Sequence, residues 1–393
     1  MKTMKWEFYS LAFVAGMSIL TACSSDDNND NDGNGGNGNG NEIENGTILK
    51  GTITSDVTLA AGNTYKLSGE YIVEEGATLH IEEGVKIIAV YDDIADYILV
   101  KQGGKINAVG TPDKPIVMTS EKEEPGAWGG IHICGRAHTN AEGGKGSSEI
   151  GGAVYGGNDD ADNSGTLQYI RLEYTGFAFD EEHEANGISF YGVGNGTIVD
   201  HCQAYKGSDD GFEFFGGSVN VSNLVAVSCS DDSFDWTEGW NGKGTNLVAY
   251  QEAESTLGYD CDCLMECDNN GSNNAATPVA HPVLKNLILV GNGGSKQGIR
   301  LRAGTEVEID NAKVCGKGQP LTVETALTKN ALKNGTSKLT NITLTSELSS
   351  KEGIYTHADF IAVTSNKVDA NLSYSSFEDI RKECSWMNGS WVK

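Results

Sequence analysis

Asn223-Leu-Val-Ala-Val and Asn246-Leu-Val-Ala-Tyr are two copies of one pattern, an asparagine followed by an apolar strand, and they begin 23 residues apart. A strand that returns at a fixed interval is typical of a solenoid. The next three copies follow at successive spacings of 40, 25 and 30 residues, as expected where loops are inserted between coils. The complete set of starting residues is Asp200, Asn223, Asn246, Asn286, Asn311 and Asn341.

A second repeat, a small residue followed by apolar, variable and apolar positions, alternates with the first. It reads Gly187-Ile-Ser-Phe, Gly211-Phe-Glu-Phe and Ser233-Phe-Asp-Trp, at spacings of 24 and 22 residues. Two alternating repeats of one period require at least two strands in each coil. About 23 residues are too few for a propeller blade, and the helix of a leucine-rich repeat is missing. The sequence therefore predicts an all-β fold, a right-handed parallel β-helix with three sheets.

Stacked coils place equivalent residues in columns along the axis, about 4.8 Å apart. Asparagine suits such a column because its amide can bond both the turn backbone and the asparagines above and below. We therefore expect the six residues that start the first repeat to form a structural ladder. One coil cannot bury its own apolar face, so the core has to run through several coils.

The open ends of a solenoid expose core and strand edges, so terminal caps are expected. Residues 46–75 are predicted to start the solenoid and to cover its first layer. The last stretch, through Phe377 and Trp386 to Trp391, is predicted to cap the other end. The period breaks near 136–165, 251–282 and 316–336, which we interpret as surface loops, where binding function tends to lie.

The N-terminus has the features of an export signal. Residues 1–22 contain a basic start and an apolar run too short to span a bilayer. The sequence Leu20-Thr21-Ala22-Cys23 resembles the lipobox of bacterial lipoproteins, which implies that Cys23 is lipidated and anchors the chain in outer-membrane lipid. Residues 23–45 are rich in Asn, Asp and Gly and predict a disordered tether. The acidic residues after Cys23 resemble the surface-export signal of Bacteroidetes lipoproteins.

The formal net charge of −27 argues against nucleic acid and anionic lipid surfaces as partners. It is compatible with solubility, with cation binding and with neutral or basic ligands. Eight cysteines follow Cys23, an even number that permits disulfides in an exported protein without defining the pairs.

Several longer motifs resemble a known family. Trp128-Gly-Gly-Ile-His-Ile-Cys-Gly, Asp209-Asp-Gly-Phe-Glu-Phe-Phe-Gly-Gly and Asp231-Asp-Ser-Phe-Asp-Trp-Thr-Glu-Gly are similar to motifs of parallel β-helix surface lipoproteins of Bacteroidetes and Gammaproteobacteria. The resemblance covers residues 75–345 and the tryptophan-rich end. It implies a pectate-lyase-like fold, and it carries over no activity.

The strongest candidate site is acidic. Its members repeat in adjacent coils, so that each carboxylate has a like charge about 5 Å away. Calcium could compensate the repulsion with oxygen ligands from two coils. Backbone N–H groups of the turns could do so without metal. Both explanations stay open, and the candidate cation ligands are Asp209, Asp210, Glu213, Asp231, Asp232 and Asp235.

An enzymatic reading starts from Ser208-Asp209-Asp210-Gly211, which resembles the paired-Asp motif of polygalacturonases. That family's Asn-Thr-Asp motif lacks its aspartate here, and its Gly-His-Gly motif is missing. An inverting hydrolase needs two carboxylates about 6.5–9.5 Å apart, a distance that Asp210 and Asp232 could meet. A duplicated Asp-Asp is also what a repeating coil produces. We therefore assign no catalytic residue.

Two single residues complete the candidates. Trp240, followed by Asn241-Gly242, is the aromatic residue expected to be exposed for ligand stacking. His201 follows Asp200 directly, and neighbours in a strand point to opposite faces, so we expect no acid–base pair there.

These features predict a cell-surface, outer-membrane lipoprotein that acts as a non-enzymatic binding or accessory protein. Its ligand would be a glycan, a peptide or a small nutrient, and its partner an outer-membrane transporter of the TonB-dependent class. The alternatives are a carbohydrate-active enzyme, either a polysaccharide lyase or a glycoside hydrolase, and a structural adhesin. No cofactor is required by the sequence, and calcium is the candidate.

Overall fold

Each central coil consists of one short and one long strand. β14 (Ile188–Tyr191) is followed by β15 (Ile198–Tyr205), and the next coil repeats them as β16 (Phe212–Phe215) and β17 (Asn220–Val227). β14 pairs with β16 and β15 with β17, in parallel and in register. The computed structural model describes residues 41–92, 94–179, 183–350 and 353–393. The predicted signal, Cys23 and most of the predicted tether lie outside these residues.

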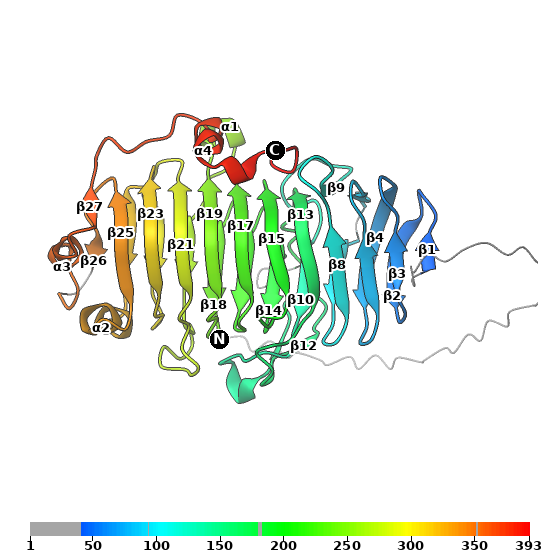
Figure 1. Ribbon diagram of the computed structural model, residues 1–393, viewed down its shortest axis with the longest axis horizontal. Coiled ribbons are helices and arrows are strands. Elements are labelled where there is room, and N and C mark those ends of the chain that lie inside the picture. Colours follow the sequence, from blue (N-terminus) through cyan, green and yellow to red (C-terminus); the bar gives the residue numbers. More distant parts are fainter. Residues whose placement is uncertain (1–40, 93, 180–182, 351–352) are drawn as a thin grey trace, which may run out of the picture. The chain divides into compact units, whose positions relative to one another are not determined.

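The long strand contributes to two sheets. β13 (Gly165–Glu173) shows this directly, because its first half pairs with β8 (Lys105–Val109) and its second half with β9 (Ile116–Ser120). We call the sheet of short strands sheet A, and the sheets formed by the first and second halves of the long strands sheets B and C. The coils therefore have the three sheets that the repeat predicts, and every pairing between the coils is parallel (Figure 1).

The strands follow one another along the axis from β1 to β27 (Figure 1). The N-terminal coils contain β1 (Asn41–Ile43), β2 (Ile48–Ile53), β3 (Val57–Leu59), β4 (Thr64–Val73), β5 (Thr78–Ile81), β6 (Lys86–Ala89) and β7 (Tyr97–Val100). Further short strands are β10 (Ile131–Cys134), β18 (Phe234–Thr237), β20 (Met265–Cys267), β22 (Gln297–Leu301), β24 (Gln319–Val323) and β26 (Ser349–Ser350). Further long strands are β19 (Lys243–Tyr250), β21 (Val283–Val290), β23 (Glu308–Cys315) and β25 (Lys338–Leu344), and β27 (Lys367–Val368) ends the series.

The core is built from columns of identical or similar apolar side chains. Phe212 and Phe234 are register partners whose rings stack at 5.7 Å with an interplanar angle of 13°. Phe190 and Phe214 stack in the same way at 5.0 Å. Because successive side chains of a strand alternate between its two faces, these inward residues leave the intervening positions of sheet A pointing outward. The register confirms the parallel β-helix.

The asparagine ladder lies at the corner between sheets B and C. Asn246 Nδ2 donates to Asn223 Oδ1 at 2.8 Å, Asn286 Nδ2 to Asn246 Oδ1 at 3.0 Å, and Asn311 Nδ2 to Asn286 Oδ1 at 2.9 Å. These residues have φ between 55° and 64°, in the left-handed region that asparagine tolerates better than most residues. The corner conformation and the amide bonds thus select the same side chain.

Two members of the predicted ladder differ from the expectation. Asp200 pairs in register with Ser222, one position before the corner, and His201 occupies the corner with a φ of 54°. Asp200 instead accepts the amide of Asn223 at 2.7 Å. Asn341 does occupy a corner, but its amide bonds Asp310 Oδ1 at 2.6 Å and not Asn311.

The prediction that Asp200 and His201 point apart is wrong. His201 Nδ1 lies 2.7 Å from Asp200 Oδ2. The alternation of side chains holds only for extended backbone, and the left-handed corner at His201 turns its ring back toward the preceding residue.

The C-terminal end of the core is closed by helices. α2 (Ala326–Asn334) and α3 (His357–Ala362) contribute Leu332 and Phe360 to the main hydrophobic core. At the other end, β1 pairs with β3, so residues that were assigned to the tether belong to the first coil. Among the described residues, no helix is long and apolar enough to cross a membrane.

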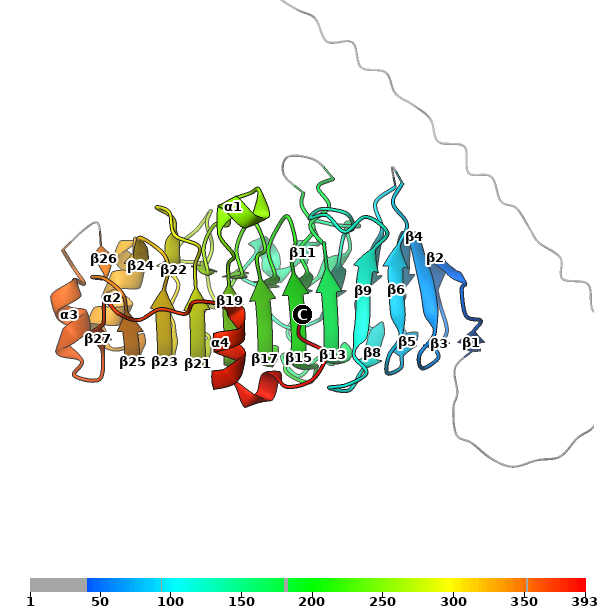
Figure 2. The same cartoon turned by 90° about the horizontal axis from the view of Figure 1, so that it is seen from above.

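The last segment does not cap the end of the solenoid, contrary to the prediction. After α4 (Phe377–Glu383) the chain runs back along the coils, with α4 beside β19 and the C-terminus near β15 (Figures 1 and 2). Ile380, Met387 and Trp391 form a separate cluster with Val225 and other outward residues of sheet C. Because sheet C presents apolar side chains outward as well as inward, it needs this cover.

The three segments that interrupt the repeat contain regular structure. Residues 136–165 hold the hairpin of β11 (Gly146–Ser147) and β12 (Val154–Tyr155). Residues 251–282 hold α1 (Glu254–Leu257) and also β20, which is a strand of sheet A. Residues 316–336 include β24 and α2. Only part of each segment is therefore loop.

Candidate functional site

A column of polar side chains runs along the outer face of sheet A. Register pairing aligns Ser189 on β14, Glu213 on β16 and Asp235 on β18. The column continues with Glu266 on β20 and Arg300 on β22. Five consecutive coils thus present one polar side chain each at intervals of about 4.8 Å.

Glu213 and Asp235 form the centre of this column. Glu213 Oε2 accepts a hydrogen bond from Asn186 Nδ2 at 2.6 Å. Asp235 Oδ1 is buried and has no hydrogen-bond partner among the described residues. Burial, reinforced by neighbouring carboxylates, raises the pKa of both groups well above the usual range. Protonation or a bound cation would relieve the repulsion between the two acids.

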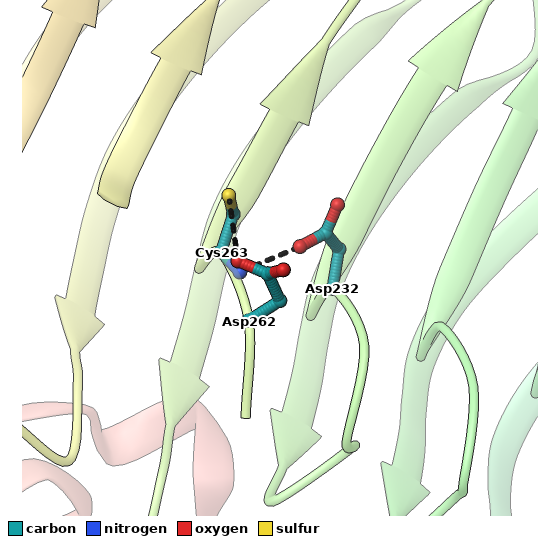
Figure 3. Close-up of side chains that lie close together, drawn as sticks. All are labelled: Asp232, Asp262 and Cys263. Atoms are coloured by element: carbon teal, nitrogen blue, oxygen red, sulfur yellow. Dashed lines mark hydrogen bonds between the residues drawn. The ribbon is translucent and has the colours of Figure 1, made fainter. Parts of the chain in front are cut away.

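Asp210 and Asp232 lie in the turns that lead from sheet C into sheet A. Asp210 Oδ1 accepts the backbone N–H of Asp232 at 2.8 Å, and Asp232 Oδ1 accepts that of Cys263 at 2.6 Å. Figure 3 shows Asp232 reaching the backbone of Cys263 beside Asp262. Asp210 and Asp232 are only 5% and 4% exposed. Each carboxylate thus binds the equivalent turn of the next coil.

The preceding aspartates differ in exposure. Asp209 is buried, and its burial together with the charge of Asp231 raises its pKa to about 8. Asp231 lies at the surface. Asp209, Asp210 and Asp231 nevertheless offer oxygens that all lie within 4.8 Å of one another.

The same closeness holds for two further groups of carboxylates. Asp210, Glu213 and Asp235 form one of them, and Asp232, Asp235 and Glu266 the other. Asp235 belongs to both groups, and its Oδ1 is the oxygen without a hydrogen-bond partner among the described residues. Carboxylate oxygens from adjacent coils are the hard ligands that Ca²⁺ takes at 2.3–2.6 Å in flexible geometry. The donor set therefore fits a divalent cation at Asp235.

Arginines neutralise the C-terminal part of the column. Arg300 Nη1 lies 2.8 Å from Glu266 Oε2, and Arg302 Nη2 lies 2.7 Å from Glu266 Oε1. Arg302 also pairs with Asp268 at 2.7 Å. Within the part of the chain that the structure describes, no lysine or arginine forms an ion pair with Asp210, Glu213 or Asp235. The carboxyl groups in the centre of the column therefore lack a basic partner among the described residues.

The N-terminal part of sheet A is covered by the segment that contains β11 and β12. Ile150 and Tyr155 from this segment form an apolar cluster with Leu99, Tyr191 and Phe215 of sheet A. Tyr191 Oη donates to Glu149 at 3.3 Å, and burial raises the pKa of Glu149 to about 7. The acidic centre thus lies beside a loop that is itself anchored to the sheet.

The assignment of Trp240 as an exposed ligand-stacking residue is wrong. Its side chain is 1% exposed, its ring stacks on Phe214 at 4.1 Å and 14°, and Nε1 donates to Val219 O at 3.2 Å. The turn between β18 and β19 folds the indole into the core, where it fills space next to Trp236. A tryptophan before Asn-Gly is therefore no sign of exposure in this fold.

The sequence did not assign Glu266 and Arg302 to the same site as Glu213 and Asp235. The segment 251–282 obscured the period, although Leu264-Met265-Glu266-Cys267 has the same apolar and polar alternation as Phe234-Asp235-Trp236. The eight cysteines after Cys23 are all buried and free. Burial raises the pKa of several of these thiols, that of Cys261 to about 12.

The stacked parallel coils define the class of protein, a parallel β-helix with a carboxylate-rich outer face. The chain belongs to the family of pectate-lyase-like β-helix domains, because the model of that family matches residues 51–392. No curated protein matches the chain. Among solved structures, the chain is similar to the Dettilon tailspike protein (gp208), at 8% identity and a TM-score of 0.28. The similarity covers 75% of this chain, which spans 56% of the tailspike chain.

Proposed function

We propose that this protein is a non-enzymatic binding or accessory protein of the outer membrane, and that it holds a glycan, a peptide or a small nutrient. The single observation that carries the proposal is the position of Asp210 and Asp232. Both carboxylates bind backbone N–H groups of turns and are almost fully buried. They are therefore poorly placed to act as an acid and a base on opposite sides of a glycosidic bond.

We further propose that calcium binds the carboxylates around Asp235 and fixes the outer face of sheet A. Support comes from three-carboxylate groups within 4.8 Å and from the unpartnered Asp235 Oδ1. The bound ion would supply positive charge beside Asp210, Glu213 and Asp235, which have no arginine or lysine as an ion-pair partner among the described residues. Its ligands would be drawn from Asp209, Asp210, Glu213, Asp231, Asp232 and Asp235.

Membrane attachment is proposed from the sequence. Leu20-Thr21-Ala22-Cys23 supports acylation of Cys23, and residues 23–40 supply a polar tether between the lipid and the first coil. An outer-membrane transporter is the proposed partner. An adhesin would share the same anchor and scaffold, and it would bind a cell or matrix surface in place of a soluble glycan.

A polysaccharide lyase or hydrolase is the second candidate. The observation in its favour is that Arg300 and Arg302 lie on the same outer face as Asp235 and Glu266. Acidic and basic groups side by side on one face are what such an enzyme would use. Against it, both guanidinium groups are held in ion pairs with carboxylates.

The experiment incubates the purified protein with a panel of polysaccharides, with calcium or with chelator, and measures both retention and product release. Retention without release is expected. Release of reducing or unsaturated ends that Asp210→Asn abolishes would establish the enzyme instead. Asp113→Asn, an exposed acid on another part of the solenoid, serves as the matched control.

A further inference from the structure

A cavity lies on another side of the solenoid from the acidic column, between the asparagine ladder and the C-terminal segment. Its volume is about 310 Å³. Its lining includes Asn246, Asn286, Asn311, Lys313, Glu383 and Trp386. We propose that this cavity binds a pyranose unit of a neutral glycan. This inference rests on the proposed glycan binding, and it places the glycan site in this cavity and not at the acidic column.

The ladder provides one wall with unused hydrogen-bonding capacity. A side-chain amide has two N–H donors and an oxygen that accepts two bonds. The ladder uses one donor of each of Asn246, Asn286 and Asn311, and it leaves Asn311 Oδ1 with no bond to any described residue. Asn286 and Asn311 are exposed. Planar amides at coil spacing can bind the adjacent hydroxyl groups of one sugar ring.

Trp386 provides the aromatic wall. Its ring is partly buried and packs near Trp391, with centroids 6.2 Å apart, and near His201, at 6.4 Å. These contacts fix the indole while it still lines the cavity. An aromatic face suits the C–H face of a pyranose, since it offers a large apolar area at low entropic cost.

The charges at the cavity favour a neutral ligand. Lys313 and Glu383 form an ion pair with each other, and Tyr374 Oη donates to Glu383 Oε2 at 2.8 Å. The pair leaves no net charge to attract an ionic ligand, while its polar atoms remain able to bond hydroxyl groups. The volume lies at the lower end of small-molecule sites, which suits one or two sugar rings.

The test titrates the full chain with neutral oligosaccharides prepared from mannan, xylan and dextran, and follows calorimetry and tryptophan fluorescence. Asn311→Gly is compared with Asn341→Gly. Both positions have positive φ, which glycine tolerates, and each loses one side-chain amide bond, but Asn341 lies outside the cavity. We expect Asn311→Gly to weaken binding roughly tenfold, the effect of losing one or two hydrogen bonds to the ligand. Asn341→Gly should leave it unchanged.

Trp386→Phe, checked for folding by its melting temperature, should also weaken binding and should abolish any ligand-induced change in fluorescence from Trp386. If the wild type binds an oligosaccharide and both cavity variants bind it equally well, this cavity is not the site and the proposed function stands. If the wild type binds none of these neutral probes, the cavity assignment fails, and retention of another polysaccharide in the panel would leave the proposed function standing. Equal losses in Asn311→Gly and Asn341→Gly would indicate general damage to the ladder and would overturn the assignment.

Discussion

Asp210 Oδ1 accepts the backbone N–H of Asp232, its counterpart one coil further along the axis, at 2.8 Å. The bond joins the two aspartates that most resemble a catalytic pair, and it gives the first of them a structural role. The carboxylate satisfies a buried N–H group that would otherwise be left without an acceptor.

The first prediction concerns this bond. Asp210→Ala removes the acceptor and should lower the free energy of unfolding by about 1–3 kcal/mol. Asp210→Asn keeps an oxygen in the same place and removes a buried acid, so it should cost much less. Denaturant unfolding of the two variants measures the difference. Equal losses would show that the bond does not stabilise the turn.

The second prediction concerns calcium. An ion that binds only the folded state should raise the melting temperature, with a stabilisation of about 2.7 kcal/mol at a concentration one hundred times its dissociation constant. Asp235→Asn should remove most of this gain, whereas Asp113→Asn should retain it. Thermal melts with calcium and with chelator provide the measurement. A wild type that melts at one temperature in both would contradict the cation site.

The third prediction concerns pH in the absence of calcium. Burial raises the pKa of Asp209 from 3.8 to about 8 and that of Glu149 from 4.5 to about 7. A raised pKa means that the folded chain holds these protons more tightly than the unfolded chain. The resulting stability is present below the unfolded values and is lost as pH rises through the folded ones. We expect the melting temperature in chelator to fall between about pH 5 and pH 8.

Calcium should flatten this pH profile, because the ion replaces the protons as the compensating charge. Asp209→Asn provides the variant control, since it should reduce the fall in chelator. A melting temperature that rises over the same interval would show that the carboxylates are stabilised in their charged form by something other than a cation.

The fourth prediction concerns the corner of the coil. Asn246 has a φ of 60°, so Asn246→Ala adds backbone strain to the loss of two amide bonds, and Asn246→Gly loses only the bonds. Alanine should be the more destabilising by roughly 0.5–1 kcal/mol. At Thr245, in the extended backbone of the same strand, glycine should be the worse substitution. The opposite order at Asn246 would rule out the strained corner.

The fifth prediction concerns Trp240. Trp240→Ala should cost about 3–5 kcal/mol of stability, because the indole is buried against Phe214. Trp240→Phe retains a stacking ring and should cost less. At temperatures where both variants remain folded, ligand binding should match that of the wild type. A selective loss of binding without a loss of stability would restore Trp240 as a ligand contact.

The parallel β-helix could be predicted because residues of the same type recur at the coil period. Phe212 and Phe234 recur at the coil period, and so do Asn223 and Asn246, and stacking turns that period into columns. The pairing of Glu213 with Asp235 follows from the same register. Any feature that repeats with the coil can therefore be found from the sequence alone.

Features that depend on a local departure from the repeat could not be predicted. The corner of one coil is occupied by His201, and Asp200 lies one position earlier, opposite Ser222. The membership of Glu266 is concealed by the insertion before it. The course of the C-terminal segment depends on which apolar face lacks cover. Sheet C is apolar on both sides, and this becomes apparent only when Val225 and Ile380 are found in one hydrophobic cluster.

The sequence by itself determined the coil, its period and the stacking of like residues, because a short-range pattern repeated many times is sufficient to specify a one-dimensional array. Only the tertiary structure decided which carboxylates bind turns, which lack a counter-charge and where Trp240 and Trp386 lie. Those properties depend on burial and on contacts between residues far apart in the chain, such as Trp391 with His201.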